Sequence, residues 1–149
     1  MLELHLVDDI TTAEAIAQAE ASCTPHPWSA AMYAESISGQ DQVFAYNSAS
    51  AQTIGYAVIL QVLDEIQLQN IFISKPWQRQ GYGRKLLQLL MELAAKQNCS
   101  RMLLEVRESN LAARELYLSC GFKETGLRKQ YYRSDSGPRE NAILMEASL

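Results

Sequence analysis

The segment Gln78 to Arg84 reads Gln-Arg-Gln-Gly-Tyr-Gly-Arg and has the residue types of an anion-binding loop. Gly81 and Gly83 carry no side chain, so backbone amides there can approach an anion closely. If a helix begins within this segment, its first N–H groups are unpaired and its dipole adds positive charge. The sequence therefore predicts a diphosphate-binding loop. The alternative is an ordinary turn at the start of a helix, because short glycine motifs are weak evidence alone.

Glu105 is a carboxylate within the otherwise apolar stretch Met102 to Val106. Burying an unpaired carboxylate is costly, so its presence requires either a partner or a chemical role. Arg107, two residues on and on the same face of a strand, is the candidate structural partner. Both interpretations of Glu105 are open on the residues alone.

Tyr117 and Asn110 belong to a helix that we expect from Leu111 to Cys120. Asn110 is suited to cap its first turn, and Gly121 is suited to end it. An aromatic residue near the end of a helix, such as Tyr117, more often packs in a core than takes part in chemistry. Both side chains therefore have a structural explanation beside any functional one.

The first part of the chain predicts a short strand and two helices. Leu2 to Leu6 alternates apolar and polar residues, which is typical of a half-buried strand. Thr11 opens a capping box for a helix that runs to about Ala21. Ser29 is expected to cap a second helix, which Gly39 ends in the left-handed conformation.

The middle of the chain predicts a sheet and one long helix. Val43 to Tyr46, Thr53 to Val62 and Gln67 to Ile73 are rich in β-branched and aromatic residues and predict an antiparallel meander. Arg84 to Gln97 has an apolar face at helical spacing. Met102 to Val106 is almost wholly apolar, which predicts a central strand covered on both faces. Strand, long helix and strand then form a right-handed βαβ crossover.

Two closing strands, Phe122 to Tyr132 and Ala142 to Glu146, complete a mixed α/β order without an internal repeat or linker. The length of 149 residues is usual for one domain, so we expect a single domain over residues 1–149. The net charge of −4 and the pI near 5.2 disfavour nucleic acid as a partner and favour a basic peptide.

The beginning of the chain does not indicate secretion. Glu3, Asp8 and Asp9 stand where a signal peptide has a basic start and an apolar run. The most apolar uncharged stretch, Thr53 to Leu63, is shorter than the ~20 residues that span a bilayer. We therefore expect a cytoplasmic protein without a membrane partner.

The cysteines and histidines predict neither disulfides nor a metal site. Cys23, Cys99 and Cys120 are odd in number and lack Cys-x-x-Cys spacing, which favours reduced thiols. His5 and His26 do not stand at the spacing of metal ligands, so we expect no metal.

The glycine segment lacks the lysine of a P-loop and the third glycine of a dinucleotide-binding fold. It matches the Gln/Arg-x-x-Gly-x-Gly/Ala signature of the GNAT superfamily of N-acetyltransferases, which this chain resembles from about Gln67 to Phe122. Asn70 to Pro76 is similar to the strand before that loop, and Glu105 to Asn110 with Tyr117 is similar to the strand and helix after it. The resemblance implies a GNAT fold, with a mixed central β-sheet, a βαβ coenzyme-binding crossover and flanking helices. It also implies acetyl-CoA as the acetyl donor.

Within the superfamily, the chain is most similar to the RimI group, which acetylates the N-terminal alanine of a small-subunit ribosomal protein. The similar segments are Pro27-Trp28-Ser29, Gln78-Arg79-Gln80-Gly81, Leu104-Glu105-Val106-Arg107 and Arg128-Lys129-Gln130-Tyr131-Tyr132. The departures are Phe72 in place of a small residue, Lys75 and Trp77 around the proline, and Pro138 in the late hairpin. These departures concern peptide specificity more than the coenzyme site.

The resemblance implies a role for each candidate residue. Glu105 is the general base, acting through a water on an α-amine whose ordinary pKa of about 7.7–8.0 lies below the ~10.4 of lysine. Tyr117 donates a proton to the departing thiolate and contacts the coenzyme, and Asn110 contacts its pantetheine arm. Backbone amides of the splayed strand hold the thioester oxygen and the pantetheine, and the residues concerned are Ile71, Phe72 and Ile73.

The remaining implied contacts are with the diphosphate and the peptide. The diphosphate-binding residues are Arg79, Gln80, Gly81, Tyr82, Gly83 and Arg84. The substrate-binding residues are Trp28, Tyr131 and Tyr132, which also suit hydrophobic packing. The expected reaction is direct acetyl transfer to the N-terminal amine of a basic protein, expected to be a ribosomal protein.

Two other functions stay open. One is a GNAT enzyme that acts on lysine, a polyamine or a small metabolite. The other is a non-catalytic module that binds acyl-CoA, against which the presence of both Glu105 and Tyr117 argues.

Overall fold

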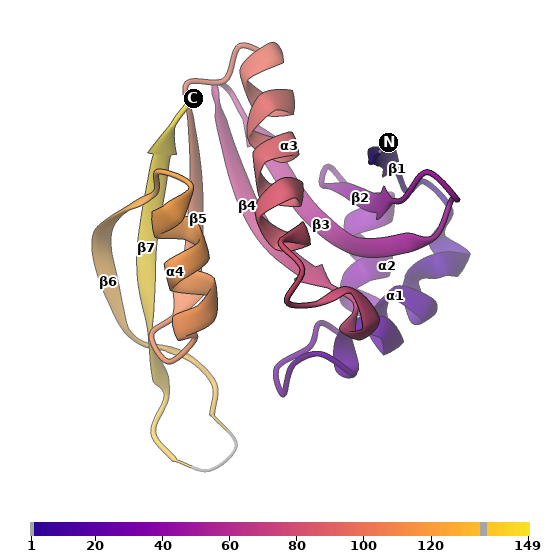
Figure 1. Cartoon of the computed structure of the whole chain (residues 1–149). Coiled ribbons are helices and arrows are strands. Elements are labelled where there is room, and N and C mark those ends of the chain that lie inside the picture. Colours follow the sequence, from indigo (N-terminus) through magenta and orange to yellow (C-terminus); the bar gives the residue numbers. More distant parts are fainter. Residues whose placement is uncertain (1, 135–136) are drawn as a thin grey trace.

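One seven-stranded sheet runs through the computed structural model, which describes residues 2–134 and 137–149 (Figure 1). The strand order is β1-β2-β3-β4-β5-β7-β6. The strands are β1 (Glu3–Leu6), β2 (Gln42–Asn47), β3 (Thr53–Val62), β4 (Glu65–Ile73), β5 (Arg101–Arg107), β6 (Lys123–Tyr132) and β7 (Glu140–Ser148). The helices are α1 (Ala13–Ala21), α2 (Ala30–Ser38), α3 (Tyr82–Lys96) and α4 (Leu111–Ser119), with short 3-10 turns at Ile10–Thr12 and Lys75–Trp77. This order confirms the predicted antiparallel meander, long helix and two closing strands.

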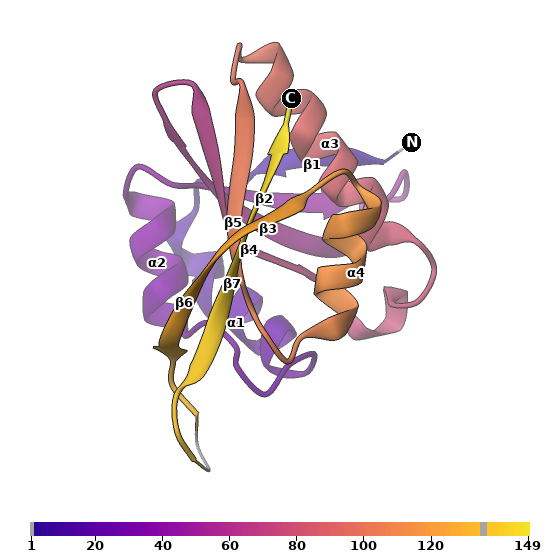
Figure 2. The same cartoon turned by 90° about the vertical axis from the view of Figure 1, so that its left-hand side faces the viewer.

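Two apolar cores cover the two faces of the sheet. On one face, α3 buries Leu86, Leu87 and Leu90 against the sheet, and α4 adds Tyr117. On the other face, α1 and α2 bury Ile16 and Tyr33 against strands β2 to β4. Figure 2 shows the two pairs of helices on opposite sides of the sheet. The apolar periodicity of the predicted helices therefore reports real buried faces.

Strands β4 and β5 are parallel, as the predicted βαβ crossover requires, but they pair only briefly. Their register runs from Glu65 opposite Arg101 to Leu68 opposite Leu104. A bulge follows at once in β4, where Gln69 is an extra residue relative to β3. Bulges bend and twist a strand, which accounts for the divergence of β4 from β5 in Figure 1. The separated ends of these strands frame the candidate site.

Strand β5 is not covered on both faces, and that prediction is wrong. Met102, Leu104 and Val106 are buried toward α3 and α4. Leu103 and Glu105 alternate with them and are only partly buried, because they line an open cavity on the other face. An apolar run in this strand thus combines a core face with a binding face.

Three of the five predicted helix-end residues are confirmed, and one of them is Gly121, which follows α4 in the left-handed region with a φ of +93°. The side chains of Ser29 and Asn110 accept from the backbone N–H groups of Met32 and Ala113, as expected. Thr11 is not a cap, because Asp9 precedes it and accepts from its N–H at 2.9 Å. Gly39 follows α2 but has a φ of −99°, so it does not end the helix in the left-handed conformation.

Among residues 2–134 and 137–149, no helix is both long enough and apolar enough to cross a membrane.

Candidate active site

The loop between β4 and α3 is fastened to the end of β4. Gln78 Nε2 donates to the carbonyl oxygen of Ile73 at 2.9 Å, and Gln80 Nε2 donates to that of Pro76 at 3.2 Å. Gly81 precedes α3 with a φ of +84°, and a Cβ added there would meet no atom within 4 Å. Since Gly81 has no side chain to cap the helix, the first N–H groups of α3 have no side-chain partner at the N-cap. The loop therefore fits an anion such as a diphosphate.

The other residues predicted for this loop have distinct surroundings. A Cβ at Gly83 would lie 3.5 Å from Leu116 Cδ2, which is an ordinary van der Waals contact, so packing alone does not require glycine there. The ring of Tyr82 packs against that of Trp77 with centroids 5.7 Å apart. Arg79 and Arg84 are exposed, so both guanidinium groups are accessible to a ligand. The side chain of Tyr82 thus serves packing, and its position at the start of α3 supplies a backbone N–H.

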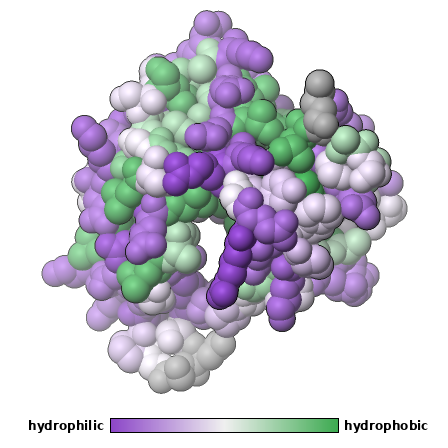
Figure 3. All heavy atoms as spheres, in the orientation of Figure 1, coloured by the Kyte–Doolittle hydropathy of each residue, from purple (hydrophilic) through white to green (hydrophobic). Residues whose placement is uncertain are grey.

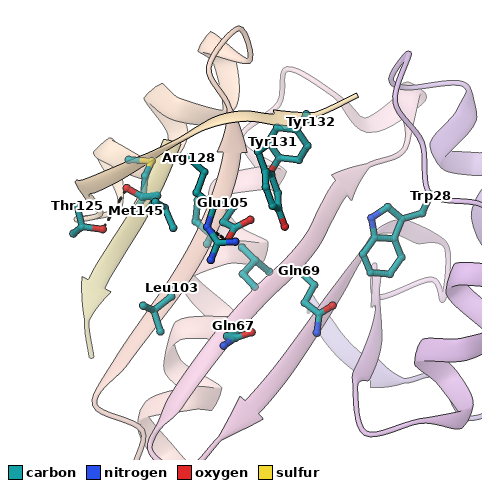
Figure 4. A pocket seen from close by; sticks show the side chains of 13 residues that line it. Trp28, Gln67, Gln69, Leu103, Glu105, Thr125, Arg128, Tyr131, Tyr132 and Met145 are labelled. Carbon is teal, nitrogen blue, oxygen red and sulfur yellow. Dashed lines mark hydrogen bonds and ion pairs between the residues drawn. The ribbon is translucent and has the colours of Figure 1, made fainter. Parts of the chain in front are cut away.

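Glu105 points into a cavity of about 490 Å³ on the face of the sheet away from α3 and α4 (Figure 4). The cavity is lined by Trp28, Gln67, Leu68, Gln69, Leu103, Leu104, Glu105, Thr125, Arg128, Tyr131, Tyr132, Leu144 and Met145. The space-filling view is hollowed between the α3 side and the α4 side of the molecule, where β4 and β5 separate (Figure 3). The three predicted substrate residues, Trp28, Tyr131 and Tyr132, therefore lie around the same cavity as Glu105.

The ionic partner of Glu105 is Arg128, whose Nε lies 3.4 Å from Glu105 Oε1. The proposed pairing with Arg107 is wrong. Arg107 Nη1 instead contacts Glu140 Oε2 at 3.3 Å and donates to the carbonyl oxygen of Arg133 at 3.1 Å. Its guanidinium also lies 4.5 Å from the centre of the Tyr132 ring. Spacing along β5 could not identify Arg128 as the partner, because Arg128 lies on β6, at the edge of the sheet.

Tyr131 and Tyr132 both reach the cavity although they are consecutive, because β6 is irregular beside them. The register with β7 shifts between Arg128 and Tyr132, and Gln130 has a φ of +53°. The negative charge of Glu105 raises the pKa of Tyr131. Burial and then the same charge raise the pKa of Tyr132 to about 12. Both phenols therefore stay protonated near neutral pH.

Tyr117 belongs to α4, packs in the core on the α3 and α4 face of the sheet, and is not among the described residues that line this cavity. Its side chain is 7% exposed, and its ring lies 5.7 Å from that of Phe122. Burial raises the pKa of Tyr117, and the nearby phenol of Tyr132 raises it further. The phenol of Tyr132 therefore lies within electrostatic reach of both Glu105 and Tyr117.

The predicted coenzyme strand contains one feature that the sequence did not reveal. The backbone N–H of Ile71 donates to Oδ1 of its neighbour Asn70 at 3.0 Å. Asn70 Nδ2 in turn donates to Glu20 Oε2 at 2.9 Å. Glu20 is 3% exposed, so it is a buried carboxylate at the centre of a polar cluster.

Glu20 Oε1 completes this cluster on the substrate side. It accepts from the backbone N–H of Trp28 at 2.9 Å and from Tyr33 Oη at 2.7 Å. A signal for it was present in the sequence, because Glu20 shares the helical face of Ala13 and Ile16, which are buried. A glutamate on an apolar face requires hydrogen-bonding partners.

Comparisons with known proteins agree with this geometry. A family model described as the Acetyltransferase (GNAT) family matches residues 13–122. A [Ribosomal protein bS18]-alanine N-acetyltransferase of Escherichia coli is 40% identical over 119 residues, which are 80% of this chain and 79% of that protein. The crystal structure of the ribosomal-protein-S18-alanine N-acetyltransferase from Escherichia coli superposes with a TM-score of 0.85 and 34% identity, covering 99% of this chain and 94% of that chain.

A spermidine N-acetyltransferase from Vibrio cholerae, solved as a dodecamer, has a TM-score of 0.80 at 18% identity, covering 99% of this chain and 93% of that chain. Similarity at that level of identity shows the shared fold alone.

Proposed function

The chain belongs to the acetyltransferase (GNAT) family, and from this premise we propose that it acetylates the N-terminal alanine of ribosomal protein bS18, using acetyl-CoA. The observation that carries the proposal is 40% identity over four fifths of the chain to a protein of that name, together with a cavity in which Glu105 lies among aromatic side chains. Membership of the family confirms the predicted enzyme class, an acetyl-CoA-dependent N-acetyltransferase.

The described residues fit a coenzyme. The open φ-positive position at Gly81 and the exposed N–H groups at the start of α3 suit a diphosphate. The side chains of Arg79 and Arg84 are accessible for additional phosphate contacts. The end of β4 that does not pair with β5, Ile71 to Ile73, lies beside this loop and offers backbone groups to the pantetheine arm. Ile71 N–H already has an internal acceptor, and the alternation of the antiparallel ladder that pairs Ser74 N–H with the carbonyl oxygen of Ile54 directs Phe72 N–H toward Tyr56 of β3. Ile73 is therefore the position whose N–H is left to supply the thioester contact.

Glu105 acts as the general base in this proposal. Its carboxylate faces the cavity in which a peptide N-terminus would lie. An α-amine has an ordinary pKa of about 7.7–8.0, so the base needs to remove only a weakly held proton at neutral pH. The neutral amine then attacks the thioester, and the backbone donors stabilise the negative charge that develops on its oxygen.

Tyr117 is the proposed acid for the departing thiolate. Its raised pKa keeps the phenol protonated, which a hydrogen-bond donor requires. Asn110 caps α4 close to this region and is proposed to contact the pantetheine as well. The position of Tyr117 behind the sheet, toward α3, suits a contact with the coenzyme better than one with the peptide.

Trp28, Tyr131 and Tyr132 form the proposed walls for the substrate peptide, because all three line the cavity with Glu105. The net charge of −4 favours a basic N-terminal segment. We further propose that residues 1–149 form one acetyltransferase domain in the cytoplasm. One sheet containing strands from both ends of the chain supports this organisation.

Mass spectrometry after incubation with acetyl-CoA tests the proposed substrate. The panel contains a bS18 N-terminal peptide that begins with alanine, the same peptide with its α-amine blocked, a lysine-containing peptide and spermidine. We expect one added acetyl group on the alanine α-amine and none on the blocked peptide. Acetylation of the lysine peptide or spermidine alone would favour the other enzyme functions. Acetyl-CoA binding without transfer to any amine would favour the non-catalytic module.

A further inference from the structure

Glu20 connects the two halves of the proposed site through buried hydrogen bonds. Its Oε1 holds the Trp28 loop and Tyr33 of α2, and its Oε2 holds Asn70 at the bulge of β4. The three donors are uncharged, and the carboxylate is 3% exposed. Burying a carboxylate costs desolvation free energy, and this cost indicates that Glu20 has a role in fixing the geometry around it.

The carboxylate of Glu20 determines which group donates and which accepts in the hydrogen bonds that link Glu20, Asn70 and Ile71. Glu20 Oε2 can only accept, so Asn70 must present its NH₂ group to Glu20 and to Tyr33 Oη, 3.0 Å away. The amide oxygen of Asn70 is thereby directed at the N–H of Ile71. Glu20 therefore sets which way the Asn70 amide faces, and Asn70 sets the first peptide group after the bulge.

We propose that Glu20 is a positioning residue for acetyl-CoA, which acts through Asn70 to orient the backbone amides of β4 from Ile71 to Ile73. This inference rests on the proposed function, in which the backbone of this segment contacts the thioester and the pantetheine. Through its other oxygen, Glu20 holds the loop of Trp28 in register with the same strand. One buried side chain thus couples the coenzyme side of the site to the peptide side.

Glu20→Gln keeps the shape of the side chain but replaces one of its two acceptor oxygens with an NH₂ donor. The amide oxygen of the substituted side chain still accepts from Trp28 and Tyr33, but its NH₂ group faces the NH₂ group of Asn70. If Asn70 turns over to relieve this, its NH₂ group faces the N–H of Ile71 and its bond to Tyr33 Oη is lost as well, so at least one buried bond is lost either way. Glu20→Gln combined with Asn70→Asp restores an acceptor for both donors. The bonds that residue 20 accepts from Trp28 N–H and Tyr33 Oη are the same in all three proteins, and the double variant loses only the bond from Asn70 to Tyr33 Oη.

The test compares acetyl-CoA affinity by calorimetry with the ¹H–¹⁵N signal of the Ile71 amide, both without peptide. We expect Glu20→Gln to weaken acetyl-CoA binding about tenfold, the scale of one lost buried hydrogen bond, with unchanged stoichiometry and a shifted Ile71 signal. The double variant should recover affinity to within about threefold. The kcat for peptide acetylation should fall in Glu20→Gln while the peptide KM stays within about twofold, because the Trp28 bond is kept.

Glu65→Gln is the matched control, because Glu65 binds Arg101 at the opposite end of β4. It should lower thermal stability without changing acetyl-CoA affinity. If Glu20→Gln does not fold, Asn70→Ala removes the same link and should weaken binding by a similar factor. Unchanged affinity in a folded Glu20→Gln or Asn70→Ala protein would overturn the proposal, as would failure of the double variant to recover.

Failure of the proposed substrate is distinguishable from failure of this inference. A wild-type protein that binds acetyl-CoA but does not acetylate the alanine peptide contradicts the substrate alone, while the calorimetric and Ile71 comparisons still decide the role of Glu20.

Discussion

Glu105 of β5 and Arg128 of β6 form an ion pair across the cavity face, although β7 separates their strands in the sheet. The Arg128 side chain is 53% exposed, and its guanidinium lies 5.2 Å from the centre of the Tyr131 ring. An exposed pair of this kind contributes roughly 0–1 kcal/mol to stability. The cation beside the proposed base is therefore held on the wall of the cavity and not in the core.

Arg128→Gln and Arg107→Gln should differ in their effect on stability. Arg128→Gln should lower the free energy of unfolding by less than about 1 kcal/mol. Arg107→Gln should lower it by about 1–3 kcal/mol, because it removes bonds to Glu140 and Arg133 and the contact with the Tyr132 ring. Denaturant unfolding at pH 7 measures both, and equal losses would contradict the assignment of Arg107 to the structural network.

Gly81→Asn tests the diphosphate loop with less strain than a branched side chain. The φ of +84° at Gly81 disfavours valine, whereas asparagine tolerates the left-handed region. Its side chain would enter the open space next to the start of α3, so acetyl-CoA affinity should fall at least about tenfold with little change in thermal stability. Gly137→Asn is the control, because Gly137 lies in the late hairpin, far along the chain from this loop. Wild-type affinity in the Gly81 variant would remove the loop from the coenzyme site.

Tyr117→Phe should lower kcat by about 10²-fold, the scale of general acid assistance. Acetyl-CoA affinity and stability should change little, because phenylalanine fills the same buried position beside Phe122. Steady-state kinetics with the alanine peptide measure the effect, and Tyr56→Phe, away from the cavity, serves as the matched change. A fully active Tyr117 variant would leave that residue with a packing role only.

Glu140 predicts an acid-dependent loss of stability. Hydrogen bonds from Ser109, followed by the contact with Arg107, lower the pKa of Glu140 below its usual value of 4.5. A carboxyl whose pKa is lower in the folded state stabilises the protein above its unfolded pKa and loses this contribution as pH falls through the folded pKa. The stability difference between wild type and Glu140→Gln should therefore be full above about pH 5 and shrink below about pH 4.5. Thermal unfolding from pH 7 to 3.5 would contradict this if the difference stayed constant.

The sequence predicted the parts of the site that local patterns encode. The Gly81 loop, the Asn110 cap and the order of strands follow from turn chemistry and hydrophobic periodicity, which act over a few residues. The same patterns assigned Glu105 to the strand that is β5, and Tyr131 and Tyr132 to the strand that is β6. Only the folded sheet shows that these three side chains line one cavity.

The errors arose where distant segments or irregular strands decide the contact. Arg128 reaches Glu105 from an edge strand, so spacing within β5 could not identify it. The bulge at Gln69 brings Asn70 toward α1, and the shift in β6 brings two consecutive tyrosines to one face. A strict period of two cannot anticipate either irregularity. The Glu20 cluster was missed for the same reason, although its helical face gave a partial signal.

The pH dependence of Glu105→Gln tests the central claim most directly. Glutamine keeps the size of the side chain but cannot accept the proton from the attacking amine. As pH rises toward 9, a free α-amine with an ordinary pKa of about 8 becomes mostly neutral, so the solvent replaces the base. Measuring kcat/KM for an alanine-initiated peptide from pH 6 to 9.5, we predict a large loss at pH 6 that narrows steadily toward pH 9.5. A loss of the same factor at every pH would contradict general-base catalysis by Glu105.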